Sequence, residues 1–126
     1  MDNNNYLIIE DQDIETMVTS RLIKKWFPDL VPTEKRNGKE ALEYLSNAKN
    51  NFPGLIMVDL IMPIMDGFEF LEKYDKTFLS KHPNTIVVVF TTSINPRDKT
   101  KALSFKCVNG FLEKPIGKEE LAKVLK

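Results

Sequence analysis

The sequence has little cysteine: Cys107 is the one thiol among 126 residues, so the chain cannot form an internal disulfide bond. It has no apolar run that approaches the ~18 residues of a membrane-spanning helix. Its first residues, 1–5, are acidic and polar, whereas a secretory signal needs a basic stretch followed by an apolar one. These absences exclude a disulfide-rich secreted domain and a membrane protein, and they favour a location in the cytoplasm.

The chain also has no excess of charge of either sign. Lysine plus arginine and aspartate plus glutamate both number 18, so the formal net charge is zero. No overall basic field is present to attract nucleic acid, which argues against direct binding of DNA or RNA. Hydrophobic residues make up 42% and charged residues 29%, as in a globular protein. Because this length suits a single domain, we expect one domain that spans residues 1–126.

Segments typical of strands and of helices alternate along the whole chain. The predicted strands are apolar or β-branched runs, at residues 6–9, 31–35, 55–58, 86–90 and 110–112. The helical segments between them begin with N-terminal signals such as Asp13, the pair Asn37 and Glu40, and Asn95 followed by Pro96. Five strands alternating with five helices predict an α/β fold, in which right-handed crossovers place helices on both faces of a parallel sheet.

Polar side chains follow the ends of four of these strands. Glu10 and Asp11 follow the first strand, Asp59 the third and Thr91 the fourth, and Lys114 comes shortly after the fifth. In open α/β sheets, ligands bind beyond the carboxyl ends of the strands, so we expect these side chains to converge at one edge. Three close carboxylates repel one another unless a cation lies among them. So few oxygen ligands suit Mg²⁺, which keeps several of its waters, better than Zn²⁺ or a caged Ca²⁺.

The same group of side chains also suits a phosphoryl group. The charged phosphoryl oxygens need cations and donors, which Mg²⁺, Lys114 and the Thr91 hydroxyl would supply. Asp59 follows the middle strand of the pattern and is the best-placed nucleophile for forming an acyl phosphate. Taken singly, each side chain has an ordinary structural explanation, such as capping a helix or lying in solvent. The combination favours the chemical interpretation.

Four stretches make the sequence similar to a known family over essentially its full length. They begin at Leu7 (LIIED), Val58 (VDLIMPIMDG), Val88 (VVFTTS) and Gly110 (GFLEKP). In this order and spacing they resemble the receiver domain of two-component response regulators, of the single-domain, chemotaxis-receiver type. The resemblance implies a three-layer flavodoxin-like fold, with a five-stranded parallel sheet of order 2-1-3-4-5 and five helices on both faces.

The resemblance also implies a role for each matched residue. Glu10 and Asp11 correspond to the acidic pair that binds Mg²⁺, and the Ile61 main-chain carbonyl is a further ligand. Asp59 corresponds to the phosphoacceptor and also ligates the metal. The other matches lie around the phosphoryl group: Thr91 as the switch hydroxyl, Lys114 as the phosphate-binding lysine, Phe111 as the switch aromatic, and Pro115 as a proline that follows a cis peptide bond.

In this family, a histidine kinase or a histidine phosphotransfer protein donates the phosphoryl group. Phosphorylation then changes the surface of helix 4, strand 5 and helix 5, which controls an unknown downstream protein. We expect no output domain after Lys126, so that the signal leaves through protein contacts or onward phosphotransfer. The resemblance thus implies a phosphoacceptor that assists its own phosphorylation and dephosphorylation, and not an enzyme.

Several positions depart from common family patterns, among them Cys107-Val108, which stands where Gly-Ala is frequent. Glu10 stands where aspartate is frequent, which lengthens one arm of the metal site. Ile61 is aliphatic where polar residues are often found, and Thr92 is bulkier than the usual alanine. Ile61 and Thr92 should hinder the water that hydrolyses the acyl phosphate, which predicts a long-lived phosphoaspartate.

Two other functions fit parts of the pattern. One is a metal-dependent phosphohydrolase with an aspartyl nucleophile. Enzymes of the haloacid-dehalogenase type place Asp-x-Asp after strand 1, whereas this chain has Glu10-Asp11-Gln12-Asp13 there. The other is a receiver-like interaction module that is never phosphorylated, although none of the required side chains is missing from the sequence. The phosphoacceptor interpretation accounts for more of the residues than either alternative.

Overall fold

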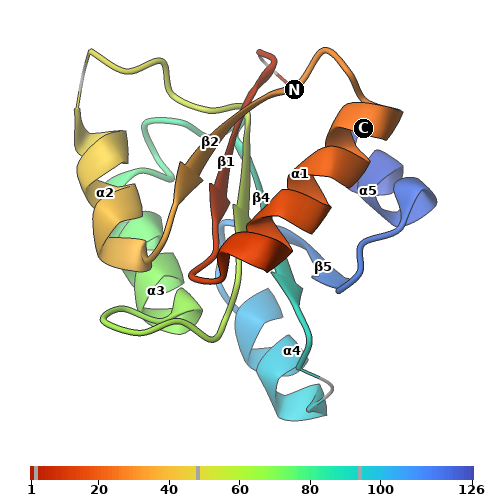
Figure 1. The fold of residues 1–126 in the computed structure, drawn as a ribbon. Coiled ribbons are helices and arrows are strands. Elements are labelled where there is room, and N and C mark those ends of the chain that lie inside the picture. The colour runs from red at the N-terminus through yellow and green to blue at the C-terminus, as the bar shows by residue number, and fades with distance from the viewer. Residues whose placement is uncertain (2, 48, 94) are drawn as a thin grey trace.

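The computed structural model describes residues 1, 3–47, 49–93 and 95–126. Strands and helices alternate from β1 to α5 (Figure 1). The strands are β1 (Asn5–Ile9), β2 (Val31–Lys35), β3 (Leu55–Val58), β4 (Ile86–Thr91) and β5 (Val108–Glu113). The helices are α1 (Asp13–Trp26), α2 (Gly38–Ser46), α3 (Gly67–Thr77), α4 (Pro96–Leu103) and α5 (Lys118–Leu125).

A parallel sheet of order β2-β1-β3-β4-β5 forms the middle of the molecule. This order confirms the predicted α/β class and the topology that the family resemblance implies. The prediction for the last strand, 110–112, covers only half of β5. The start of β5 is irregular, because the Asn109 side chain accepts the Val87 main-chain N–H at 2.8 Å and the register shifts between Val87 and Val88. An apolar pattern does not detect such a start.

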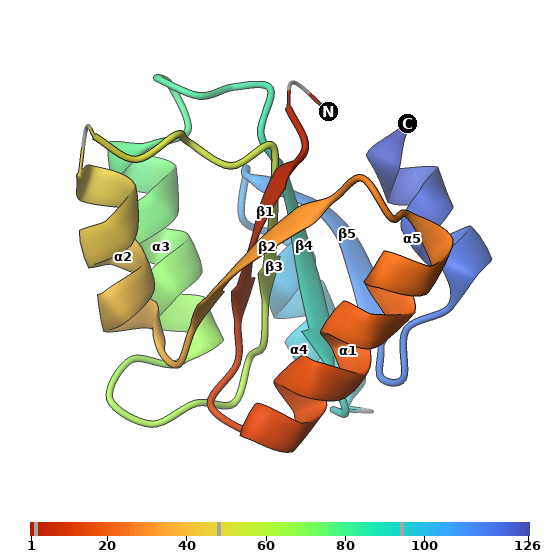
Figure 2. The ribbon, with the colours of Figure 1, turned by 45° about the horizontal axis from the view of Figure 1, so that its top comes forward.

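Helices cover both faces of the sheet (Figure 2). On one face lie α1 and α5, whose Ile23 and Leu121 pack in a core with Ile8 of β1. On the other face lie α2, α3 and α4, which contribute Leu45, Phe70 and Ala102 to a second core. None of the helices in the described part of the chain is long and apolar enough to cross a membrane. With both faces of the sheet covered, polar side chains gather at the strand ends.

Two of the predicted helix starts are confirmed by their hydrogen bonds. The Asn37 side chain accepts the Glu40 main-chain N–H at 2.9 Å at the start of α2. Asn95 accepts the Arg97 main-chain N–H at 3.0 Å at the start of α4. Each bond satisfies a main-chain donor that the first turn of a helix leaves without a partner.

The predicted cap of α1 is wrong. The N-cap residue is Gln12, which makes no side-chain cap, and Asp13 is already the first residue of the helix. The Asp13 carboxylate instead accepts a 2.6 Å hydrogen bond from Arg36, which precedes α2. The sequence pattern did not include this long-range partner, which takes the carboxylate away from the helix end.

Helix α3 begins close beneath the end of β3. The Gly67 N–H donates to the Leu60 carbonyl at 3.0 Å, and a β-carbon at Gly67 would collide with the Asp59 carbonyl oxygen. Asp66 caps the helix by accepting the Glu69 main-chain N–H at 2.9 Å. Glycine at position 67 therefore permits the close approach that holds the main chain around Asp59 in place.

Candidate functional site

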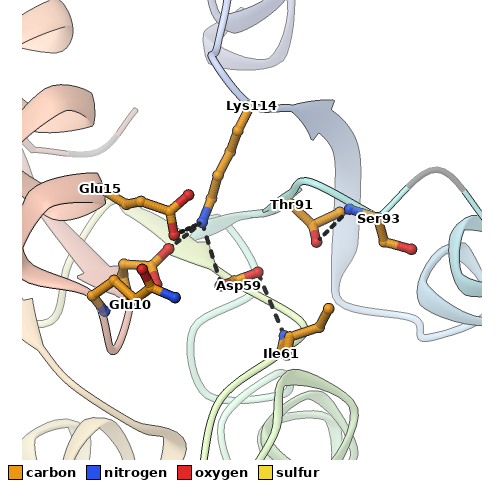
Figure 3. A network of polar contacts seen from close by, with 8 residues as sticks. Glu10, Glu15, Asp59, Ile61, Thr91, Ser93 and Lys114 are labelled. Carbon is orange, nitrogen blue, oxygen red and sulfur yellow. Dashed lines mark hydrogen bonds and ion pairs between the residues drawn. The ribbon is translucent and has the colours of Figure 1, made fainter.

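Three carboxylates meet at the carboxyl edge of the sheet (Figure 3). Glu10 follows β1 and Asp59 follows β3, and both are buried, at 2% and 5% exposure. Glu15 reaches the same place from the first turn of α1. One oxygen of each carboxylate lies within 4.8 Å of the others. The convergence of Glu10 and Asp59 follows from the neighbouring positions of β1 and β3 in the sheet.

Lys114, which follows β5, lies among these carboxylates. Its ammonium donates hydrogen bonds to Glu10 Oε2, to Glu15 Oε2 at 3.3 Å and to Asp59 Oδ2 at 3.3 Å. The ammonium also lies 4.7 Å from the ring centroid of Phe90. The peptide bond between Lys114 and Pro115 is cis, the form that the resemblance implies. A single cation thus touches all three carboxylates of the group.

Burial and the neighbouring charges together shift the pKa values of Glu10 and Lys114. Burial raises the pKa of Glu10 to about 7, the negative charge of Asp59 raises it as well, and the hydrogen bond from Lys114 opposes both. For Lys114, burial lowers the pKa, but Glu10, Asp59 and Glu15 outweigh it, so the pKa of the ammonium lies above its ordinary value. Lys114 therefore stays charged. An additional cation nearby would stabilise the charged form of the buried Glu10.

The Asp11 carboxylate is not part of the group that the structure brings together. Within the described residues that group consists of Glu10, Glu15 and Asp59. Asp11 is half-buried beside it, and its main-chain carbonyl accepts a 3.2 Å hydrogen bond from Arg36. Glu15 was not among the predicted site residues, because it does not lie at a strand end. Its spacing from Glu10, on the first turn of the following helix, is the signal that could have indicated it.

Ile61 lies beside the Asp59 carboxylate through its main chain. The Ile61 N–H donates to Asp59 Oδ1 at 3.4 Å, whereas the Ile61 side chain is 64% exposed. Ile61 thus contacts the Asp59 carboxylate through its main chain, while its side chain is largely in solvent.

Thr91 and Phe111 lie on the two neighbouring strands β4 and β5. Thr91 is fully buried, and its hydroxyl oxygen accepts the Ser93 main-chain N–H at 3.2 Å (Figure 3). Phe111 is half-buried, and the Lys99 ammonium of α4 lies 5.9 Å from its ring centroid. Thr91 therefore contacts the loop that leads to α4, and Phe111 lies beside α4 itself.

The chemistry of the donors fits a hard divalent cation. Carboxylates supply all the side-chain ligand atoms of the group, and no histidine or cysteine belongs to it among the described residues. Oxygen donors of this kind are the ligands that Mg²⁺ prefers. The buried ammonium of Lys114 contacts the same carboxylates that such an ion would bind.

Comparisons with known proteins agree with this geometry. Residues 6–126 match the family described as the response regulator receiver domain. The probable methanogenesis regulatory protein FilR2 of Methanothrix harundinacea is 33% identical over 94% of this chain and 77% of its own length. The probable transcriptional regulator ycf29 of Porphyra purpurea is 37% identical over 71% of this chain, which corresponds to 40% of that protein.

A solved structure shows the same fold. The crystal structure of a two-component response regulator from Cytophaga hutchinsonii matches with a TM-score of 0.87, over 96% of this chain and 92% of that chain, at 23% identity. The chain therefore belongs to the receiver domain family of two-component response regulators. Receiver domains are generally phosphoacceptor signalling modules that bind Mg²⁺ at an acidic pocket, and this chain has an acidic group of Glu10, Glu15 and Asp59.

Proposed function

We propose that residues 1–126 act as one receiver domain that accepts a phosphoryl group on Asp59 and thereby switches a protein-binding surface. The observation that carries the proposal is the contact of the Lys114 ammonium with the buried Asp59 carboxylate, at 3.3 Å. A carboxylate nucleophile and a fixed cation are what an incoming phosphoryl group requires. The phosphohistidine of a histidine kinase or a histidine phosphotransfer protein is the proposed donor.

The transfer forms one bond and breaks another. An Asp59 carboxylate oxygen bonds to phosphorus while the phosphorus–nitrogen bond of the donor histidine breaks, and the imidazole leaves with the electron pair. Lys114 neutralises the phosphoryl oxygens, and the Thr91 hydroxyl donates to them. Hydrolysis of the acyl phosphate later restores the Asp59 carboxylate.

Glu10, Asp11 and Asp59 are the proposed Mg²⁺ ligands, together with the Ile61 main-chain carbonyl. The bound ion would neutralise charge on the transferred group. Asp11 lies directly beside Glu10 at the end of β1, and its half-buried carboxylate is outside the Lys114 contacts. The Asp11 side chain could therefore bind a metal without first losing a contact with Lys114.

The proposed output surface consists of α4, β5 and α5, and its partner is a protein. The proposed location is the cytoplasm, where histidine kinases present their phosphohistidine. Nucleic acid is not the proposed partner, because the net charge of the chain is zero.

The test is incubation with acetyl phosphate and MgCl₂ followed by intact mass measurement. We expect the mass of one phosphoryl group to be added to the wild type and to Asp29→Asn, whose exposed carboxylate is the control. Asp59→Asn, Asp11→Ala and addition of EDTA should each abolish the added mass. Undiminished labelling of Asp59→Asn or Asp11→Ala would contradict the site. Steady turnover of p-nitrophenyl phosphate with Mg²⁺ would instead favour a phosphohydrolase.

A further inference from the structure

Glu15 adds a carboxylate to the site that none of the functions assigned above requires. It belongs to the first turn of α1, and its Oε2 atom accepts a hydrogen bond from Lys114 at 3.3 Å. The Glu15 side chain is 33% exposed, whereas the side chains of Glu10 and Asp59 are 0% and 7% exposed. Glu15 is thus the partner of Lys114 that faces solvent.

The contacts of Lys114 create a competition with any divalent cation. The ammonium touches Glu10 and Asp59, which are the carboxylates that a divalent ion in the same group would take. Two cations a few ångströms apart repel each other strongly where burial reduces the screening by water. A metal that enters must therefore displace the ammonium from Glu10 and Asp59. Glu15 is the remaining carboxylate of the group, and it is not among the proposed metal ligands.

The structure leaves room for this displacement on the side of α1. A cavity of about 260 Å³ is lined by residues that include Glu15, Lys114 and Thr92. The ammonium can shift toward Glu15 within this cavity while the aliphatic part of Lys114 stays against its wall. Among the α1 residues that line the cavity, Ile14 and Val18 are apolar and Thr19 is uncharged, so Glu15 supplies the negative charge on that side.

We propose that Glu15 is a positioning residue, which receives the Lys114 ammonium when a divalent cation binds to Glu10 and Asp59. By offering the displaced ammonium another carboxylate, Glu15 lowers the free energy needed to exchange the lysine for the metal. It also keeps the displaced ammonium within the site, from which it can reach the oxygens of a phosphoryl group on Asp59. The inference rests on the proposed metal site and adds a residue that acts through Lys114.

The test is a titration of the metal-free protein with MgCl₂, followed by calorimetry and by NMR shifts near Asp59. Glu15→Gln should weaken Mg²⁺ binding about fivefold, the size expected for the loss of one partly exposed ion pair. Lys114→Gln, which removes the competing ammonium, should strengthen it. Glu72→Gln is the matched control, because it removes the same charge from an exposed ion pair with Lys76 on α3. This control should bind Mg²⁺ like the wild type.

The double variant Glu15→Gln/Lys114→Gln separates a positioning role from direct action on the metal. If Glu15 acts through Lys114, its loss weakens binding less in the Lys114→Gln background than in the wild type. An equal or larger loss in that background would overturn the inference, because Glu15 would then act on the metal itself. Unchanged affinity of Glu15→Gln would overturn it as well, while leaving the proposed metal site intact. A wild type that binds no Mg²⁺ would overturn both, and thermal unfolding of each variant checks that the fold is kept.

Discussion

The Ser93 hydroxyl donates a 2.6 Å hydrogen bond to the Asp98 carboxylate, so the loop after β4 is tied to helix α4. The main-chain N–H of Ser93 at the same time donates to the Thr91 hydroxyl oxygen at 3.2 Å. Two consecutive hydrogen bonds therefore connect the buried hydroxyl of Thr91 with the first turn of α4. A movement of Thr91 should therefore disturb Ser93, which also binds the first turn of α4.

Replacement of Ser93 by alanine removes the side-chain half of this connection. We expect Ser93→Ala to lower the free energy of unfolding by about 1 kcal/mol, the usual net worth of such a hydrogen bond. Amide hydrogen exchange in residues 96–103 should become faster, because α4 loses its tie to the β4 end. Ser20→Ala is the control, since Ser20 makes only a local, exposed hydrogen bond in α1. Equal exchange in α4 of wild type and Ser93→Ala would show that the contact does not hold the helix.

Ile64 has an unfavourable main-chain conformation. Its φ angle is 68°, and among the described residues it is the one non-glycine residue with a positive φ. A β-branched side chain is strained there, whereas asparagine adopts this region readily. The Ile64 side chain is 77% exposed, so little buried apolar surface offsets the strain.

Ile64→Asn should therefore raise the free energy of unfolding by about 1 kcal/mol, since the strain at such a position is of that order. Urea denaturation is the measurement. Ile61→Asn is the matched control, because Ile61 lies in the same loop, is 64% exposed and has no positive φ. It should change the stability by less than about 0.5 kcal/mol, as surface substitutions usually do. Equal effects of the two substitutions would count against strain at Ile64.

The sequence predicts part of the site for a reason that sheet geometry explains. Glu10 and Asp59 lie directly after apolar runs, and parallel strands place such positions at one edge. Glu15 is different, since its carboxylate reaches Lys114 only because the first turn of α1 lies beside that edge. Asp11 is next to Glu10 in the sequence, yet successive side chains leave an extended segment in different directions. Spacing in the sequence alone therefore does not show that the Glu15 carboxylate joins the group while the Asp11 carboxylate does not.

The fold is predictable to a similar extent. Apolar runs located β3 and β4 almost residue by residue, because strands buried on both faces have no polar alternation to obscure them. Periodicity does not say which strands are neighbours, so the order of the sheet came from the family resemblance. The predicted cap of α1 was wrong by one residue, because the helix already begins at Asp13, whose carboxylate binds Arg36.

The lifetime of the phosphorylated form should depend on Ile61 and Thr92. Both side chains are exposed, and Thr92 lines the cavity that Lys114 borders. In the family geometry they flank the phosphoryl group, so their aliphatic parts should hinder an attacking water. The double variant Ile61→Asn/Thr92→Ala should hydrolyse its phosphoaspartate about tenfold faster, which corresponds to about 1.4 kcal/mol in the barrier. Loss of the phosphoryl mass over time measures the rate, and an unchanged or slower rate would contradict steric shielding.

The switch itself should depend on the Thr91 hydroxyl. A phosphoryl group on Asp59 adds close to two negative charges, which attract the Thr91 hydroxyl as a donor. We expect movement of Thr91 to change its hydrogen bond with Ser93 and to free space beside α4, into which the half-buried Phe111 ring would turn. NMR spectra of the beryllofluoride-bound wild type should therefore show shifts from Asp59 through Phe111 into residues 97–103. Thr91→Val should still bind the mimic but lose most of these distant shifts, whereas Thr91→Ser, which keeps the hydroxyl, should retain them. If Thr91→Val shows the full distant response, the hydroxyl does not transmit the signal and this mechanism is wrong.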